Sequence, residues 1–180
     1  MGEGEAVERE ERVERDKAGR IRRRYTIAGE VLDGELLSYD DAGTLEAKLV
    51  YKTGVLDGEQ LFYDRGRVQL SVQYRDGVEE GERIVYGDSG KPVLKAQYKA
   101  GKQAGATSWF RPDGSLQRTA VYADGLLEGE MVDYDEKGRV TERAQYKADK
   151  LHGDLLRYDR AGKVREKLVF VEGVQKKARA

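Results

Sequence analysis

The sequence predicts an all-β fold, in which about six β-hairpin units of about 24 residues form one elongated antiparallel sheet. Three observations lead to this prediction. Glycines recur at a fixed interval, aromatic residues recur at fixed distances from these glycines, and apolar and polar residues alternate between them. A spacing that recurs along a whole chain reflects its architecture before it reflects chemistry.

The glycines form three series, which the stretch YADGLLEGEMVDYDEKG at residues 122–138 illustrates. The first series is Gly29, Gly54, Gly77, Gly101 and Gly125, with Asp149 in the sixth unit and Gly173 at the start of a further one. The middle series is Gly34, Gly58, Gly81, Gly105, Gly129 and Gly153, and the last is Gly43, Gly66, Gly90, Gly114, Gly138 and Gly162. The three series shift together, so the chain contains a true repeat.

Two aromatic series follow the same interval. One lies five residues after each middle glycine: Tyr39, Tyr63, Tyr86, Phe110, Tyr134 and Tyr158. The other lies eight residues after each last glycine: Tyr51, Tyr74, Tyr98, Tyr122, Tyr146 and Phe170. Between these positions apolar and polar residues alternate, as in the segment VQLSVQY after Gly66, and a period of two indicates strands. A lone hairpin is only marginally stable in water, so neighbouring units must pair edge to edge.

The turns are predicted from short loops that contain aspartate and end in glycine: YDDAG, YDRG, YGDSG, FRPDG, YDEKG and YDRAG. This composition is typical of a type I turn followed by a glycine at positive φ. A metal site is the alternative use of these carboxylates. We prefer turn capping, because one carboxylate per loop lacks the clustered ligands of a calcium site.

The two ends of the sequence depart from the repeat pattern, and we therefore expect four segments. Residues 29–173 form the repeat domain, and residues 10–28 follow its template loosely, as a degenerate unit that caps the sheet and protects its edge. Residues 1–9 are expected to be a disordered tail, with a short helix in VEREERVERDK as the alternative, and residues 174–180 a basic tail.

Composition argues against several functions. The net charge of -1 does not fit an electrostatic nucleic-acid binder, and no apolar run is long enough to span a membrane. The chain has no cysteine and a single histidine, His152, so neither a zinc site nor a nucleophilic triad can be assembled. We therefore expect no enzymatic activity and no cofactor. The expected location is the cytoplasm, with the periplasm as the alternative if a leader has been removed.

A partner-binding site is predicted where the repeat varies. Four residues after the middle glycine of units two to four stand Phe62, Val85 and Trp109, an apolar strip with polar residues in the same position of the other units. Gln60 and Arg83 lie two residues earlier on the same face. An apolar strip that contains a tryptophan and has a polar rim is typical of an interaction hot spot. The alternative is that these side chains pack on one another and stabilise the sheet.

The unit Tyr-x-x-Gly-x-x-x-Gly-x-x-x-x-Tyr-x-x-x-Gly, seen in YADGLLEGEMVDYDEKG and again in YKTGVLDGEQLFYDRG, resembles the MORN repeat, specifically the bacterial variant of YwqK-type antitoxins. The resemblance covers roughly residues 25–173. It implies a protein-binding scaffold, often the immunity partner of a secreted toxin, without a shared active site. The fourth unit departs from the pattern at Ala104-Gly105-Ala106, where other units carry an acidic residue on one or both sides of the glycine.

Three functions follow from these observations. The first is a non-enzymatic antitoxin or immunity protein that binds a cognate toxin and blocks it sterically. The second is recognition of glycans or cell wall, because choline-binding repeats are also rich in glycine and aromatic residues, although a single Trp argues against their aromatic cage. The third is a membrane-associated scaffold, as attributed to eukaryotic MORN proteins. The open edges of the predicted sheet also allow self-association.

Overall fold

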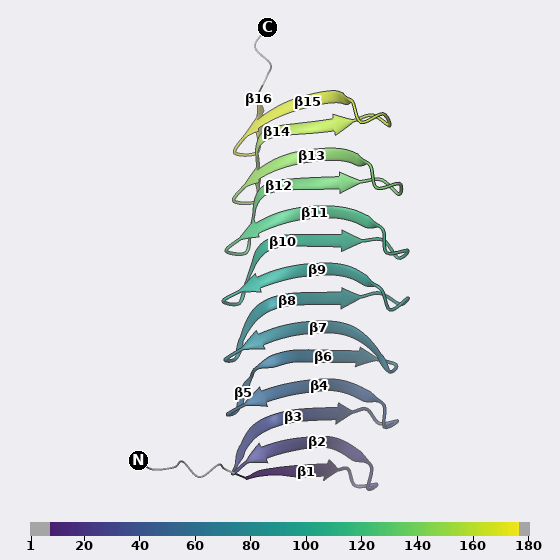
Figure 1. Ribbon diagram of the computed structural model, residues 1–180, viewed down its shortest axis with the longest axis vertical. Helices are drawn as coiled ribbons and strands as arrows, with labels where there is room; N and C mark the ends of the chain where they lie inside the picture. The colour runs from purple at the N-terminus through teal and green to yellow at the C-terminus, as the bar shows by residue number, and fades with distance from the viewer. Residues whose placement is uncertain (1–7, 177–180) are drawn as a thin grey trace, which may run out of the picture. The chain divides into compact units, whose positions relative to one another are not determined.

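The computed structural model describes residues 8–176, which consist of strands and turns without a helix (Figure 1). Sixteen strands in this part of the chain belong to one antiparallel sheet, in which they follow the order of the chain, and β5 pairs only with β4. This arrangement confirms the all-β fold and the hairpin repeat. No helix in the described residues is long and apolar enough to cross a membrane. The chain divides into two compact units, one up to Gly81 and one from Glu82 onward.

The first unit contains three hairpins, β1–β2, β3–β4 and β6–β7. Its strands are β1 Arg9–Arg15, β2 Ile21–Ala28, β3 Val31–Tyr39, β4 Leu45–Lys52, β5 Val55–Leu56, β6 Gly58–Asp64 and β7 Arg67–Arg75, and β8 Val78–Tyr86 begins here. The helix considered for residues 7–17 is wrong over β1, because Arg9 to Arg15 pair with β2 along their whole length. Residues 1–7 of the predicted N-terminal tail lie outside the described residues.

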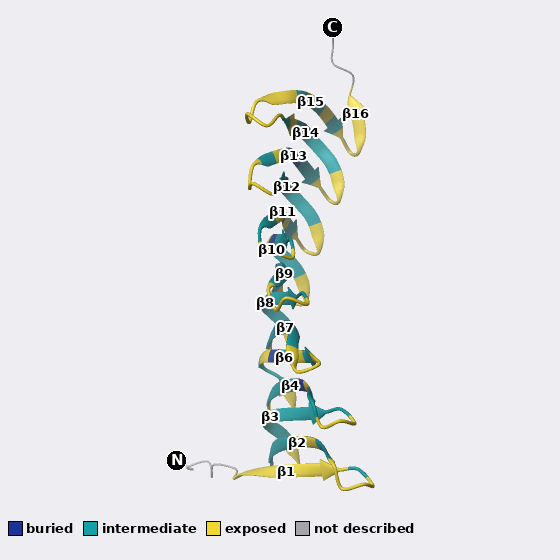
Figure 2. Cartoon of the chain, turned by 90° about the vertical axis from the view of Figure 1, so that its right-hand side faces the viewer, coloured by how far each residue is buried: buried dark blue, intermediate teal, exposed yellow. Residues whose placement is uncertain are grey.

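The second unit contains the hairpins β10–β11, β12–β13 and β14–β15, together with the end of β8 and with β9. Its strands are β9 Pro92–Lys99, β10 Lys102–Phe110, β11 Leu116–Ala123, β12 Leu126–Tyr134, β13 Val140–Lys147, β14 Lys150–Tyr158, β15 Val164–Val171 and β16 Val174–Lys176. The predicted basic tail therefore begins as a strand, and its residues 177–180 lie outside the described part of the chain. Seen from the side, the strands near the end of this unit are arched (Figure 2).

The arch coincides with a break in strand register beside the middle glycine of each hairpin. Between β11 and β12, for example, Ala120 pairs with Met131 and Tyr122 pairs with Leu127, so β12 has two extra residues around Gly129. Gly129 has a φ of 104°, which other residues rarely adopt. Extra residues in one strand bend it and increase its twist, which explains why a glycine recurs in the middle of a strand.

The turns that end at Gly43 and Gly138 confirm the capping role of aspartate. The Oδ1 atom of Asp40 accepts hydrogen bonds from the N–H groups of Ala42 and Thr44, both at 2.8 Å. Asp135 makes the equivalent bonds to Lys137 and Arg139, both at 2.9 Å. These loops have the predicted type I turn and glycine bulge.

The YDRG loop is a correction to the prediction. Asp64 pairs directly with Arg67, and the two residues between them have positive φ values, 50° at Arg65 and 74° at Gly66. This geometry is a two-residue type I′ turn. The loop is one residue shorter than the others, so it has no room for the type I turn and the bulge.

In each unit most buried side chains form a row along the middle of the strands on one face, whereas Ser71 and Val132 are buried on the other face. In the second unit the row contains Ala96, Thr107, Ala120, Ala144 and Leu155, which pair with one another or with Met131 across neighbouring strands. Small residues suit this position because an arched strand brings the side chains of its inner face together. In the first unit Gln60 pairs with Val72 in the corresponding position, and both are buried.

Candidate protein-binding surface

Beside the buried row, the second unit carries a second row of side chains, which we call the Trp109 row. Its members lie opposite one another from β9 to β15: Leu94, Trp109, Arg118, Asp133, Glu142, Arg157 and Glu166. Side chains of directly opposed residues point to the same face of an antiparallel sheet. The Trp109 row is therefore one continuous surface feature, apolar at Leu94 and Trp109 and charged from Arg118 onward.

The charged part of the row is held by cross-strand ion pairs. Nε and Nη2 of Arg118 donate to the two carboxylate oxygens of Asp133 at 2.5 and 2.9 Å. Arg157 donates to Glu142 at 2.9 Å and to Glu166 at 2.6 Å. The hydrogen bond with Asp133 raises the pKa of Arg118 further above its ordinary value. The row thus presents charges of both signs in fixed positions, with Asp133 and Glu142 side by side.

Trp109 lies at the boundary between the apolar and the charged part. Its side chain is half-buried, and with Gln117 and Arg118 it lines a shallow hollow of about 130 Å³. Val85, on the strand β8 that borders β9, and Leu94 are also half-buried. Because the sheet has one layer, these apolar side chains keep part of their surface in water.

Phe62 belongs to the first unit. It lies on β6 opposite Ala47 and Leu70, and 38 % of its surface is exposed. Phe62 is therefore partly open to solvent, and its role in binding stays a prediction.

Gln60 does not belong to an accessible surface. Its side chain is fully buried, and its amide accepts from the N–H of Val50 at 2.8 Å and donates to the carbonyls of Val50 and Gly58 at 3.2 and 3.0 Å. These bonds replace backbone pairing at the bend of β4 and β6. The sequence pattern placed Gln60 on the right face but could not show that this face is covered at its centre.

Arg83 occupies the position of Gln60 in the next repeat, within the second unit. Its guanidinium lies 4.4 Å from the ring centre of Tyr98 and donates to the Tyr98 hydroxyl at 3.1 Å. A cation over an aromatic face is attracted by the ring quadrupole. Arg83 therefore contacts Tyr98 across the strands, and its role in binding stays a prediction.

Sequence reasoning missed the charged half of the Trp109 row. Arg118, Glu142 and Glu166 each lie four residues after a last glycine, the position that Leu94 holds in an earlier repeat. Comparing the strand before each turn with the strand after it would have predicted these pairs. The prediction considered only the strand before the turn.

The single histidine and several turn aspartates have structural contacts. His152 accepts a hydrogen bond at Nδ1 from the N–H of Glu172 at 3.4 Å, which is a turn contact. Within residues 8–176, no group of three or more His, Asp or Glu side chains could hold a metal ion. Asp40, Asp135 and Asp159 accept hydrogen bonds from the backbone of their own turns.

Residues 32–53 match the family model of the MORN repeat variant. The matched segment is the hairpin β3–β4 with its connecting turn, which is one complete repeat. The match supports the MORN resemblance of the repeat, and MORN repeats are in general modules that bind proteins or membranes. A comparison with curated proteins gave no match to the chain.

Proposed function

We propose that the chain is a non-enzymatic protein-binding scaffold, and more specifically an immunity protein that neutralises a bacterial toxin by covering its active cleft. The observation that carries the proposal is the Trp109 row, in which an apolar anchor continues into charges held by ion pairs. The MORN match supports binding in general. The toxin and the cytoplasmic location are part of the proposal.

The row suits a protein partner because its apolar half and its charged half contribute to binding in different ways. Partial burial of Trp109 and Val85 by a partner removes apolar surface from water, and a tryptophan at the centre of an interface is a common hot spot. The mixed charges of Arg118, Asp133 and Arg157 favour one register of a complementary surface and reject others. Steric occlusion requires no cofactor and no reactive group.

The experiment is co-expression with the protein encoded by the neighbouring gene, tested for toxicity when expressed alone, followed by a binding measurement with purified proteins. The double variant Val85→Ser/Trp109→Ser should lose growth protection and weaken binding at least about 10-fold, because a truncated hot spot costs 2 kcal/mol or more. The control is Val121→Ser, since Val121 is 42 % exposed and pairs with Ala106 on the opposite face.

Thermal unfolding of the same variants separates binding from packing. An unchanged midpoint with lost binding supports the proposal, whereas a large drop in the midpoint shows that Val85 and Trp109 stabilise the sheet. Binding of wall fragments, or co-sedimentation with liposomes that disappears in salt, would replace the toxin by a glycan or a membrane surface.

A further inference from the structure

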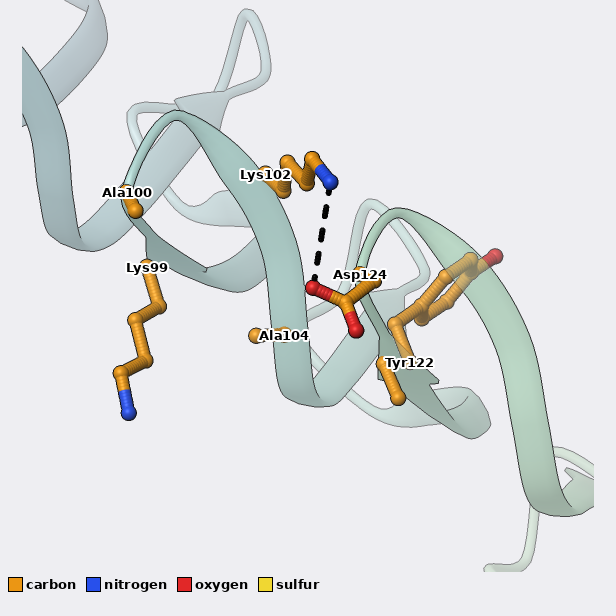
Figure 3. Close-up of a pocket in the computed structure, with 7 residues that line it drawn as sticks. Lys99, Ala100, Lys102, Ala104, Tyr122 and Asp124 are labelled. Atoms are coloured by element: carbon orange, nitrogen blue, oxygen red, sulfur yellow. Dashed lines mark ion pairs between the residues drawn. The ribbon is translucent and has the colours of Figure 1, made fainter.

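A hollow in the second unit lies beside the turn of Lys99, Ala100 and Lys102, outside the Trp109 row. It has a volume of about 400 Å³ and is also lined by Ala104, Tyr122, Ala123 and Asp124 (Figure 3). The turn after β11, at Asp124 and Gly125, forms its far side. In three other repeats a side chain fills the equivalent position. The chemistry of that side chain indicates what the hollow can bind.

In three other repeats, the side chain before the middle glycine accepts a hydrogen bond from the two-residue turn that leads into the next repeat. The donor is the N–H of the first residue of that turn. Asp57 accepts from the N–H of Asp76 at 3.1 Å. Glu128 accepts from the N–H of Ala148 at 2.8 Å, and His152 from the N–H of Glu172 at 3.4 Å. The position is therefore an acceptor site that caps the turn.

Ala104 holds this position in the fourth repeat and has no acceptor in its side chain. The turn itself is unchanged. Asp124 has a φ of 51°, close to the 47° of Ala148, and Gly125 donates to the Gln103 carbonyl at 2.8 Å, as Asp149 donates to Leu127 at 3.1 Å. Asp76, Ala148 and Glu172 hold the position of Asp124 in their own turns, and their N–H groups are capped. The N–H of Asp124 has no hydrogen-bond acceptor within residues 8–176.

The charges around the hollow are one exposed cation and one exposed anion. Nζ of Lys102 lies 3.9 Å from the Asp124 carboxylate, a loose pair in which both side chains are largely exposed. Figure 3 shows the Asp124 carboxylate between Lys102 and Ala104, and shows Lys99 directed away from this pair. An anion at Ala104 would accept from the Asp124 N–H and compete with the Asp124 carboxylate for the Lys102 ammonium, which limits its affinity.

We propose that this hollow receives a carboxylate side chain, Asp or Glu, of the partner protein. The carboxylate takes the place that Glu128 fills in the next repeat, accepts from the Asp124 N–H and pairs with Lys102. The proposal rests on the proposed function for the identity of the ligand, but the site can be tested without a partner. One charge-assisted hydrogen bond and an exposed ammonium group give a dissociation constant on the order of millimolar for a small carboxylate.

The experiment is a titration of the isotope-labelled full chain with sodium acetate, followed by amide NMR, with sodium chloride at equal ionic strength as the control. The Asp124 amide should shift with acetate in a saturable way, and Lys102→Gln should weaken this response. Ala104→Glu should abolish it, because an internal carboxylate then caps the turn. An Asp124 amide that responds equally to acetate and chloride would overturn the proposal, as would an unchanged response in Ala104→Glu.

Glu128→Ala provides the matched test in the next repeat. It removes the acceptor of the Ala148 N–H, so the Ala148 amide should begin to respond to acetate while the Asp124 response persists. An Ala148 amide that stays insensitive in this variant contradicts the capping argument. With a partner in hand, Ala104→Glu should weaken the complex and leave the effect of Val85→Ser/Trp109→Ser unchanged. Loss of the acetate response alone refutes this site but leaves the proposed function standing.

Discussion

Gly129 lies directly opposite Tyr146 in the ladder between β12 and β13. The same opposition of a middle glycine and an aromatic residue recurs in four other hairpins: Gly34 with Tyr51, Gly58 with Tyr74, Gly105 with Tyr122 and Gly153 with Phe170. The glycine bends its strand at a positive φ, and a Cβ at Gly129 would meet Val121 on the preceding strand and not the Tyr146 ring. This relationship explains why the glycine and aromatic series keep the same interval.

Alanine substitutions should show that the middle glycines are needed for two separable reasons. In Gly129→Ala the added Cβ would meet Val121 at 3.6 Å, an ordinary contact, so the φ of 104° is the main cost, and we expect a loss of about 1–2 kcal/mol. In Gly34→Ala the Cβ would also lie 2.8 Å from the Thr26 Cβ, so the loss should be larger. Denaturant unfolding measures both, and equal losses would contradict the role of Thr26.

Gln60→Leu should destabilise the first unit although other repeats hold leucine at this position, at Leu36 and Leu155. Leucine has a similar volume but removes the acceptor of the Val50 N–H, while the Val50 carbonyl keeps its hydrogen bond from the Asp57 N–H at 3.0 Å. A loss of about 1–3 kcal/mol is expected for a backbone N–H left unsatisfied within the sheet. Gln69→Leu, at a half-buried position on β7, is the control in the same unfolding experiment. A Gln60→Leu protein as stable as this control would refute the bridging role.

The turn aspartates should make stability depend on pH in acid. The hydrogen bond from the Arg139 side chain and those from the N–H groups of Arg139 and Lys137 lower the pKa of Asp135 from 3.8 to about 2. A depressed folded-state pKa contributes stability above the unfolded value, and this contribution is lost as pH falls through about 4 to about 2. In Asp135→Asn the loss over this window should be smaller. Titration of the Asp135 carboxyl by NMR checks the pKa directly, and a value near 3.8 would refute the argument.

The Arg118–Asp133 pair should show a small but measurable coupling. Its two parallel hydrogen bonds fix its geometry, but 44 % of the Arg118 side chain is exposed, and solvent screening keeps such pairs within about 0.2–1 kcal/mol. A double-mutant cycle with Arg118→Ala and Asp133→Ala measures the coupling. The Arg143–Glu130 pair, which contacts through one nitrogen at 3.2 Å, is the comparison and should couple less. A larger coupling there would show that the geometry of the hydrogen bonds does not decide the strength.

The candidate surface could be predicted only in part. The position four residues after each middle glycine located Phe62, Val85 and Trp109, because alternation along a strand assigns side chains to faces. It could not show that Gln60 is buried and Phe62 exposed on that same face, because this difference arises from the arch of the strand. Nor could it show that Arg83 is held by Tyr98, since two residues on different strands meet only once the register between the strands is set.

Local sequence patterns predict the repeat, the strands, the antiparallel hairpins and most of the turns, because glycine conformation, aspartate capping and two-residue alternation are properties of the local chain. Which side chains lie together across strands is set by the folded sheet. The Arg118–Asp133 pair, the amide bridge of Gln60 and the hollow at Ala104 each depend on register and on the bend at the middle glycine. Register and bending result from the pairing of whole strands, so local sequence patterns do not contain them.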